Sequence, residues 1–369
     1  MLGRRSLSRR MFLKGAGAVA ASSTLTLGLS SGGCAAMVDG PFADDEGSPG
    51  DGTSPDAGSA PDGDVPGDGE VPGDVPPGDD PVVDDDPGPL TVTATGVVAG
   101  RLHYVRFATQ QISWQPGVNV LLPEDYNANP TRRYPVLYLL HGGAQDFRKF
   151  HLEDDILGLT SGRRLIVVMP DGGTAGWYSN PVLSMSGPKN WETFHIHQLI
   201  PWIDANFRTY AEYDGRAVSG FSMGGFGALK YTAKYYGHFA SVSSHSGPAS
   251  LRRDGGAVLQ WASVSASTAE LGGGSLYGDP LDQARVSADN PVERLDSFGY
   301  YKRIFMVCGT DVDVNETFVR AGMRELSGLL ASRGIPHELH ELPGGHFVRR
   351  DMLQRDIDGV IARLRKAGT

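Results

Sequence analysis

Ser222 lies in a setting that can make a serine hydroxyl a nucleophile. It is the centre of the run Gly220-Phe221-Ser222-Met223-Gly224-Gly225, which follows the apolar run Ala217-Val218-Ser219 and precedes a helical pattern over Phe226–Tyr235. A G-x-S-x-G run between a strand and a helix predicts a tight turn, whose small residues let a strained serine project above the sheet edge. The positive end of the following helix favours negative charge at that place. We therefore expect Ser222 to be a nucleophile and not simply a structural turn residue.

His346 is the best-placed base for this serine, whose hydroxyl is a poor nucleophile without one. It is the last of the ten histidines and stands in Pro343-Gly344-Gly345-His346-Phe347, a turn between the strand-like segment His337–Leu342 and the final helix. For a serine on this kind of turn, the expected chain order is serine, acid, histidine. The order predicts His346 to be the catalytic base.

Other histidines near these motifs are interpreted mainly as structural residues. His195 and His197 fall in a helical segment, Trp191–Phe207, and are expected at the surface or in packing. His141 is expected to hydrogen-bond within its own turn. His245 follows a strand, and a role in the pocket is the less favoured interpretation for it.

Two backbone amides are candidates for stabilising the negative charge that develops on a substrate oxygen. The run Leu139-Leu140-His141-Gly142-Gly143 ends an apolar strand with a glycine turn. The N–H of Gly143, together with that of Met223 directly after the serine, is the natural donor pair of an oxyanion hole. Because the donors are main-chain groups, the position of Met223 matters more than its side chain.

Strand-like and helical patterns alternate along the rest of the chain. Strands are predicted at 91–93, 118–123, 134–140, 165–169, 217–219, 239–243, 304–308 and 337–342, and helices at 191–207, 226–235, 318–332 and 352–365. Such alternation predicts an α/β fold with a mainly parallel sheet covered by helices on both faces. In such sheets functional residues gather at the carboxyl ends of the strands.

Several runs resemble those of a known family. Tyr134–Gly143, Val167–Gly173, Gly220–Gly225, Leu276–Pro280 and the Gly344-Gly345-His346 turn occur in the same order in the esterase D group of α/β-hydrolases. Asn190-Trp191-Glu192-Thr193-Phe194 also resembles the secreted mycolyltransferases of that group. The resemblance covers nearly all of residues 90–369.

The resemblance implies an α/β-hydrolase fold and a Ser–His–acid hydrolase of acyl esters that needs no cofactor and no metal. Members of the group include feruloyl and acetyl-xylan esterases, S-formylglutathione hydrolases, siderophore esterases and acyltransferases, so the substrate does not carry over. Trp177, Tyr178 and Trp191 are expected either to line the mouth of the pocket or to pack within loops.

The acid that would orient His346 is ambiguous between Asp311 and Asp313. Both lie in the loop after the strand 304–308, where this fold places its acid. In the resembled family the acid commonly stands three residues after the glycine that ends the strand, which here is Val312. Counting back from Gly334 favours Asp313, whereas Asp311 is closer to the strand end. We expect Asp313, with Asp311 as the alternative.

The charges are concentrated at the amino-terminal end of the chain. Residues 38–89 contain 16 acidic and no basic residues, and residues 1–37 contain five basic and no acidic residues. The remaining 28 basic and 27 acidic residues give residues 90–369 a charge of +1. A neutral body argues against nucleic-acid binding. Two cysteines, Cys34 and Cys308, exclude a disulfide framework or a thiolate metal site.

The first 34 residues are predicted to be an export signal. The run Ser8-Arg9-Arg10-Met11-Phe12-Leu13-Lys14 followed by the apolar stretch 15–30 resembles a twin-arginine signal. The end of this segment, Leu29-Ser30-Ser31-Gly32-Gly33-Cys34, resembles an imperfect lipobox, which would make Cys34 a lipidated residue. Residues 35–89, rich in Pro, Gly and Asp, are predicted to be a disordered acidic spacer.

Together these features predict an exported serine esterase, located as a cell-envelope lipoprotein or a periplasmic or secreted protein. Its partner would be a small-molecule or polysaccharide-linked ester, with membrane anchoring through Cys34. The alternatives are an acyltransferase of the mycolyltransferase type, a surface-displayed binding protein without turnover, and a structural protein of the cell envelope.

Overall fold

The structure, a computed structural model, describes residues 86–366 of the chain. The predicted signal with Cys34, and residues 35–85 of the predicted spacer, lie outside the described residues. Ordered contacts begin before the expected boundary at residue 90, because the side chains of Gln111 and Gln198 donate hydrogen bonds to the carbonyl of Pro87. Within residues 86–366, none of the helices has the length and hydropathy needed to cross a membrane.

A single sheet organises these residues, with strand order β1-β2-β3-β5-β4-β6-β7-β8-β9. The strands β4 to β9 pair in parallel, whereas β1, β2, β3 and β5 pair antiparallel in that order. The bounds are β1 Thr91–Ala99, β2 Leu102–Ala108, β3 Gly117–Leu121, β4 Val136–Leu140, β5 Ile166–Pro170, β6 Arg216–Phe221, β7 Ser241–His245, β8 Arg303–Gly309 and β9 Glu338–Leu342. The parallel part confirms the predicted α/β fold.

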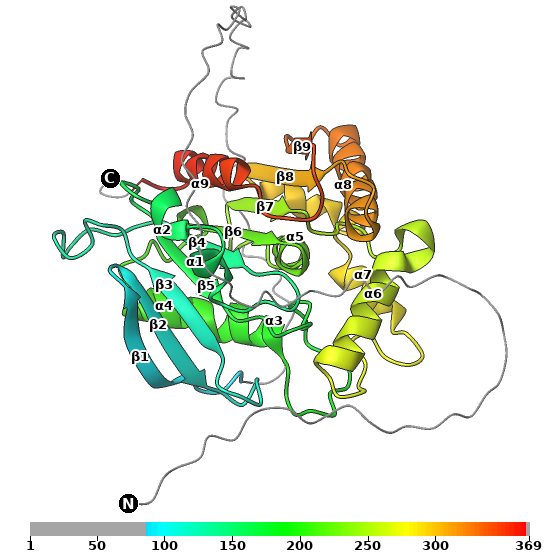
Figure 1. Cartoon of the computed structure of the whole chain (residues 1–369), viewed down its shortest axis with the longest axis horizontal. Helices are drawn as coiled ribbons and strands as arrows, with labels where there is room; N and C mark the ends of the chain where they lie inside the picture. Colours follow the sequence, from blue (N-terminus) through cyan, green and yellow to red (C-terminus); the bar gives the residue numbers. More distant parts are fainter. Residues whose placement is uncertain (1–85, 367–369) are drawn as a thin grey trace, which may run out of the picture. The chain divides into compact units, whose positions relative to one another are not determined.

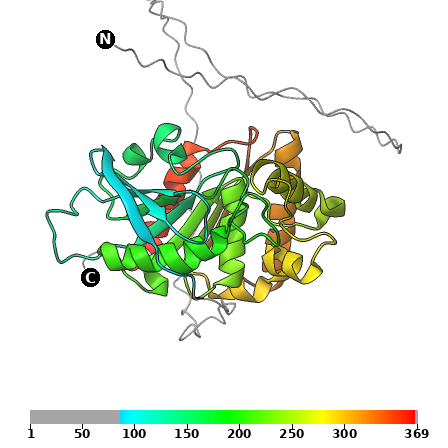
Figure 2. The ribbon, with the colours of Figure 1, turned by 90° about the horizontal axis from the view of Figure 1, so that it is seen from below.

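Helices cover both faces of the sheet (Figures 1 and 2). One hydrophobic cluster joins the sheet to α3, α4, α5, α6 and α8, and a second joins its other face to α1, α2 and α9. The bounds are α1 Lys149–Leu152, α2 Ile156–Leu159, α3 Trp191–Thr193, α4 Ile200–Asn206, α5 Met223–Lys234, α6 Arg253–Ala269, α7 Gln283–Asp289, α8 Val314–Ser332 and α9 Arg350–Arg363.

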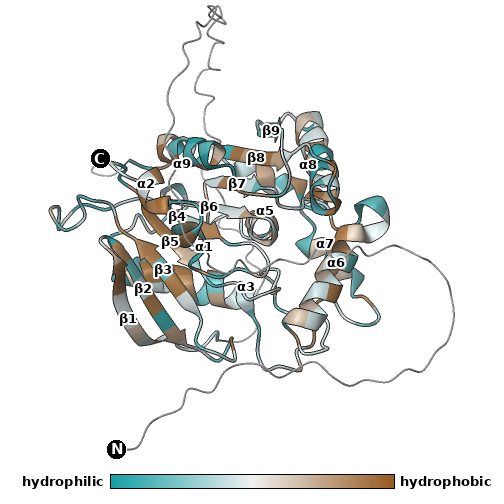
Figure 3. Cartoon of the chain, viewed as in Figure 1, coloured by the Kyte–Doolittle hydropathy of each residue, from teal (hydrophilic) through white to brown (hydrophobic). Residues whose placement is uncertain are grey.

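The central strands β3 to β8 are buried along their whole length. Figure 3 accordingly shows hydrophobic residues along strands such as β3 and β5. Burial on both faces explains why these strands appear in the sequence as continuous apolar runs and not as alternating ones. Because these strands are packed on both faces, their carboxyl ends are held in place, and candidate site residues such as Ser222 follow directly after them.

Three helical segments differ from the sequence expectation in ways that affect the site. Helix α5 begins at Met223, directly after the candidate nucleophile, and α8 begins at Val314, four residues before the predicted start. The predicted helix over 191–207 consists of α3, a wider π-helical segment, Phe194–Leu199, and α4. Capping explains the early start of α8, because the Asp313 side chain accepts a hydrogen bond from the Glu316 amide.

Candidate active site

Ser222 occupies the turn between β6 and α5, as the sequence predicts. Its backbone has φ 53° and ψ −118°, a conformation that a residue with a side chain rarely adopts. Two glycines make the turn possible: a Cβ on Gly220 would lie 2.2 Å from the carbonyl oxygen of Gly224, and one on Gly224 would lie 2.2 Å from that of Leu140. The Ser222 amide donates to the His245 carbonyl at 2.9 Å, which fixes the turn against β7.

His346 and Glu316 form a hydrogen-bonded chain with this serine. Nε2 of His346 lies 2.8 Å from the Ser222 Oγ, and Nδ1 lies 2.7 Å from Oε2 of Glu316. An ionised carboxylate can only accept, so Nδ1 carries the proton and Nε2 offers its lone pair to the serine hydroxyl. This is the tautomer that a base needs in order to remove the serine proton.

The expectation that Asp313 or Asp311 contacts His346 is wrong, because Glu316 occupies that position. Asp313 is the N-cap of α8 and accepts from the Glu316 amide at 2.7 Å. Asp311 accepts from the Gly344 amide at 3.1 Å and thereby ties together the loops before α8 and before His346. Both aspartates thus support the two loops, and the first turn of the helix supplies the carboxylate.

The carboxylate of Glu316 is fully buried and hydrogen-bonded on both oxygens. Oε1 accepts from the Ser246 hydroxyl at 2.8 Å and from the Gly309 amide, while Oε2 faces His346. Burial alone would raise the pKa of Glu316, but the hydrogen bonds from His346, Gly309 and Ser246 outweigh it and lower the pKa below its ordinary value. Glu316 is therefore ionised at neutral pH.

The two predicted oxyanion amides follow the neighbouring strands β4 and β6, which pair in parallel as far as Leu140 and Gly220. Within residues 86–366, no acceptor binds the N–H of Gly143 or of Met223. The neighbouring amides are occupied: Gly142 donates to the Gln145 side chain at 3.0 Å and Ala144 donates to the Thr174 carbonyl at 2.8 Å. The turn thus leaves Gly143 and Met223 available to an oxygen outside the protein.

Three other histidines, His141, His195 and His245, make structural hydrogen bonds. His141 accepts from the Gly172 amide at Nε2 (2.8 Å), and its Nδ1 lies 2.7 Å from the Gly142 carbonyl oxygen. His195 is buried between the Tyr231 hydroxyl and the Asp171 carbonyl, and burial lowers its pKa to about 4. The ring of His245 faces Asp356 at 3.0 Å, not the Ser222 hydroxyl.

The three aromatic residues considered for the pocket mouth are all buried. Trp177, Tyr178 and Trp191 are at most 2% exposed. Trp177 packs edge-on against Trp261 and Phe226, which belong to α6 and α5. Of the two interpretations, packing within loops is the one that the structure supports.

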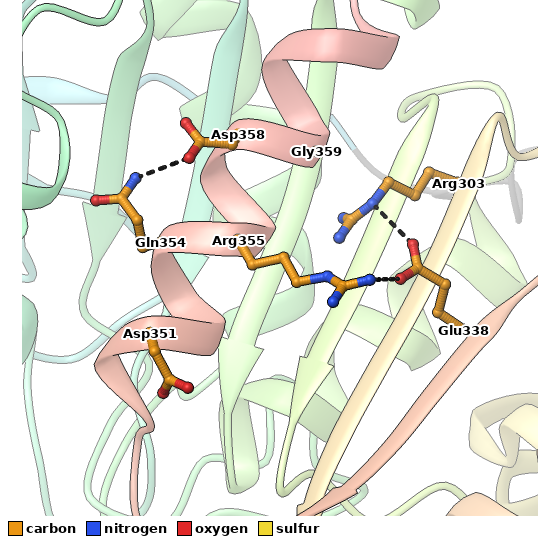
Figure 4. Close-up of a pocket in the computed structure, with 7 residues that line it drawn as sticks. All are labelled: Arg303, Glu338, Asp351, Gln354, Arg355, Asp358 and Gly359. Carbon is orange, nitrogen blue, oxygen red and sulfur yellow. Dashed lines mark hydrogen bonds and ion pairs between the residues drawn. The ribbon is translucent and has the colours of Figure 1, made fainter. Parts of the chain in front are cut away.

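A cavity of about 490 Å³ lies elsewhere, beside α9 and the strands β8 and β9 (Figure 4). Several of its lining residues bind one another: Glu338 lies 3.7 Å from Arg303 and 3.2 Å from Arg355, and the Gln354 side chain donates to Asp358. Asp351 and Gly359 complete its lining. None of these residues belongs to the Ser222–His346–Glu316 chain, so the cavity is separate from the candidate active site.

The family follows from comparison of the sequence with known families. A family model described as "Putative esterase" matches residues 109–351, which is more than half of the chain. The chain belongs to this esterase family. Esterase Rv1288 of Mycobacterium tuberculosis is 66% identical over 280 residues, covering 72% of this chain and 60% of the relative. This family member therefore spans about 60% of the length of that relative.

Solved structures agree on the fold of this esterase family member. FphF, a fluorophosphonate-binding serine hydrolase of Staphylococcus aureus, has a TM-score of 0.58 at 19% identity and covers 74% of this chain and 99% of its own. Mycobacterium tuberculosis MPT51 has a TM-score of 0.58 at 18% identity, with coverage of 70% and 97%. The chain has the α/β-hydrolase fold.

Proposed function

We propose that this member of the esterase family hydrolyses carboxylic esters through Ser222, His346 and Glu316. The observation that carries the proposal is the hydrogen-bonded chain from the serine hydroxyl to the buried carboxylate, with distances of 2.8 and 2.7 Å. Two further observations support it: no acceptor among residues 86–366 binds the amides of Gly143 and Met223, and the chain is similar to a protein named an esterase.

The first half of the reaction forms an acyl-enzyme. Oγ of Ser222 attacks the ester carbonyl carbon while Nε2 of His346 takes the hydroxyl proton. The carbonyl oxygen becomes an oxyanion that accepts hydrogen bonds from the amides of Gly143 and Met223. The carbon–oxygen bond to the alcohol then breaks, and the alcohol leaves with the proton that His346 returns to it.

The second half regenerates the serine. A water molecule gives its proton to His346 and attacks the acyl carbon, and the bond to Ser222 breaks as His346 protonates the serine oxygen. Throughout, Glu316 holds the imidazole in the required tautomer and stabilises its charged form. The lowered pKa of Glu316 keeps this carboxylate ionised while His346 gains and loses its proton.

Acyl transfer is the second candidate, because an acceptor alcohol in place of water would turn the same site into a transferase. The resemblance of residues 190–194 to mycolyltransferases favours it. A binding protein without turnover is the third candidate.

A substrate panel tests the three candidates. We expect the full-length protein to release p-nitrophenol from p-nitrophenyl acetate, butyrate and longer esters, with feruloyl and acetylated-xylan substrates and a thioester assayed in parallel. A glycerol or sugar acceptor that raises the rate and appears as an acylated product would support transfer. Absence of turnover on every ester would favour the binding protein and contradict the esterase proposal.

We further propose that the protein is exported by the twin-arginine route and anchored through Cys34. The support is the sequence pattern around Arg9, Arg10 and Cys34. Replacing both arginines by lysine should leave full-length precursor in the cytoplasm, as detected by immunoblot. Cys34→Ser should move the protein out of the membrane fraction. Unchanged fractionation of the Cys34→Ser protein would contradict the lipoprotein assignment.

A further inference from the structure

The loop Gly172–Ser179, which follows β5, binds the turn that carries the Gly143 amide. The first amide of the loop donates to Nε2 of His141, and the Thr174 carbonyl accepts from the Ala144 amide, both at 2.8 Å. The Tyr178 hydroxyl donates to the His141 carbonyl, also at 2.8 Å. The loop therefore holds this turn through three hydrogen bonds.

These contacts fix the orientation of the two peptide units before the Gly143 Cα. The Tyr178 hydroxyl holds the carbonyl of the His141–Gly142 unit. The amide of Gly172 occupies Nε2 of His141, so Nδ1 must carry the ring proton, which it donates to the Gly142 carbonyl at 2.7 Å. That carbonyl lies in the same planar unit as the Gly143 N–H, so fixing the one directs the other.

The same loop also contacts the second oxyanion residue. The Trp177 amide points at the Met223 sulfur at 3.4 Å. Trp177 and Tyr178 have φ values of 49° and 53°, in the left-handed region. Residues with side chains rarely adopt this conformation, and they persist in it only where their surroundings hold them.

A buried cluster of charges holds the strained end of this loop. Lys230 of α5 is fully buried, and its Nζ donates to the Tyr178 carbonyl at 2.9 Å and contacts Glu192 at 2.5 Å and Asp289 at 3.2 Å. Lys234 contacts the same two carboxylates at 2.6 and 3.1 Å. Two cations and two anions balance, so the cluster positions the loop without leaving a buried charge unpaired.

Glu270, at the end of α6, holds the middle of the loop. Its carboxylate accepts from the amides of Thr174 at 2.9 Å and Ala175 at 3.4 Å, and from the Trp191 indole at 3.1 Å. Trp191 and Glu192, which lie in the run that resembles the mycolyltransferases, support this loop indirectly, through Glu270 and Lys230.

We propose that Tyr178 and His141 are positioning residues, which direct the Gly143 N–H toward the oxyanion through the two peptide units before it. The inference rests on the proposed function. Burial raises the pKa of the Tyr178 hydroxyl well above its ordinary value, so the hydroxyl keeps the proton that it donates. The role requires only the hydroxyl, because the ring packs separately against His195 and Tyr231.

Tyr178→Phe tests the proposal, because it removes the hydroxyl and keeps the ring. We expect kcat for a p-nitrophenyl ester to fall by about tenfold with little change in KM, less than the loss of a whole oxyanion donor. The inhibition constant of phenylboronic acid, which forms a tetrahedral adduct with an active-site serine, should rise by a similar factor. Measuring both quantities separates a weaker oxyanion hole from weaker substrate binding.

Tyr301→Phe is the matched control, because the buried Tyr301 hydroxyl donates to the Thr232 carbonyl, outside the loop and its turn. Tyr301→Phe should leave kcat and the inhibition constant of phenylboronic acid within about twofold of wild type. Its melting temperature should fall, because the variant loses a buried hydrogen bond. If Tyr178→Phe lowers only the melting temperature, Tyr178 is structural and the inference is wrong. If wild type itself neither turns over esters nor binds the boronic acid, the proposed function fails and the inference with it.

Discussion

Ser222→Ala should reduce kcat for ester hydrolysis by about 10⁶-fold, the loss seen when the nucleophile of such a triad is removed. The variant keeps the amides of Gly143 and Met223, so any residual rate reflects binding and the oxyanion hole acting on water. The serine hydroxyl bonds only to His346 among the described residues. Its loss should therefore change the free energy of unfolding by no more than about 1 kcal/mol.

Ser297→Ala is a suitable control, because it also removes a buried serine hydroxyl that makes one hydrogen bond, to the Ala233 carbonyl at 2.8 Å. It should unfold at a slightly lower denaturant concentration and retain the wild-type kcat. A fluorophosphonate should add mass to a single peptide of the wild type, the one with Ser222, and to none in Ser222→Ala. Near-normal activity of Ser222→Ala would place the nucleophile elsewhere.

The turn around Ser222 and the fold could be predicted because their signals are local. A strand, a glycine-flanked serine and a helix follow one another within 20 residues, and buried parallel strands appear as continuous apolar runs. Chain order predicts His346 as the base. The His346–Ser222 contact joins residues 124 apart, and only the fold brings their side chains to 2.8 Å.

Counting residues from the strand end and back from Gly334 points to the two aspartates of the loop, because neither count takes account of where α8 begins. Asp313-Val314-Asn315-Glu316 has the spacing of a helix-capping pattern, with an acceptor side chain three residues before a glutamate. That pattern would have started α8 at Val314 and placed Glu316 in the first turn of the helix. Asp313 lies in the loop where the family places its acid, but in the structure its side chain caps α8.

The sequence leaves open whether Trp177 and Tyr178 line a pocket or pack inside the protein, for a different reason. Trp177 and Tyr178 occupy left-handed conformations in a loop whose supports, Lys230 and Glu270, lie far along the chain. No periodicity marks such a loop as buried, and a buried lysine has no signature that distinguishes it from an exposed one. Tertiary contacts alone determine that these rings lie inside the protein.

Glu316→Gln should reduce kcat by about 10⁴-fold, through the wrong tautomer of His346. The Gly309 amide can only donate, so it will hold the oxygen of the new side-chain amide at the position of Oε1. The NH₂ group then faces Nδ1 of His346 and donates to it, which leaves the ring proton on Nε2. A protonated Nε2 cannot remove the proton of Ser222, and no negative charge stabilises the imidazolium.

Asp311→Asn and Asp313→Asn are the matched controls, since each also exchanges one carboxylate for an amide within the same segment. Asparagine caps a helix about as well as aspartate, so Asp313→Asn should keep α8 and Glu316 in place. The side chain introduced by Asp311→Asn retains an oxygen that can accept from the Gly344 amide. Both variants should keep kcat within about tenfold of wild type, measured with the same p-nitrophenyl ester and with melting temperatures recorded for all three proteins. The opposite result would be a large loss of kcat in Asp313→Asn while Glu316→Gln is folded and active. It would mean that Asp313, and not Glu316, orients His346, and it would contradict the geometry around His346.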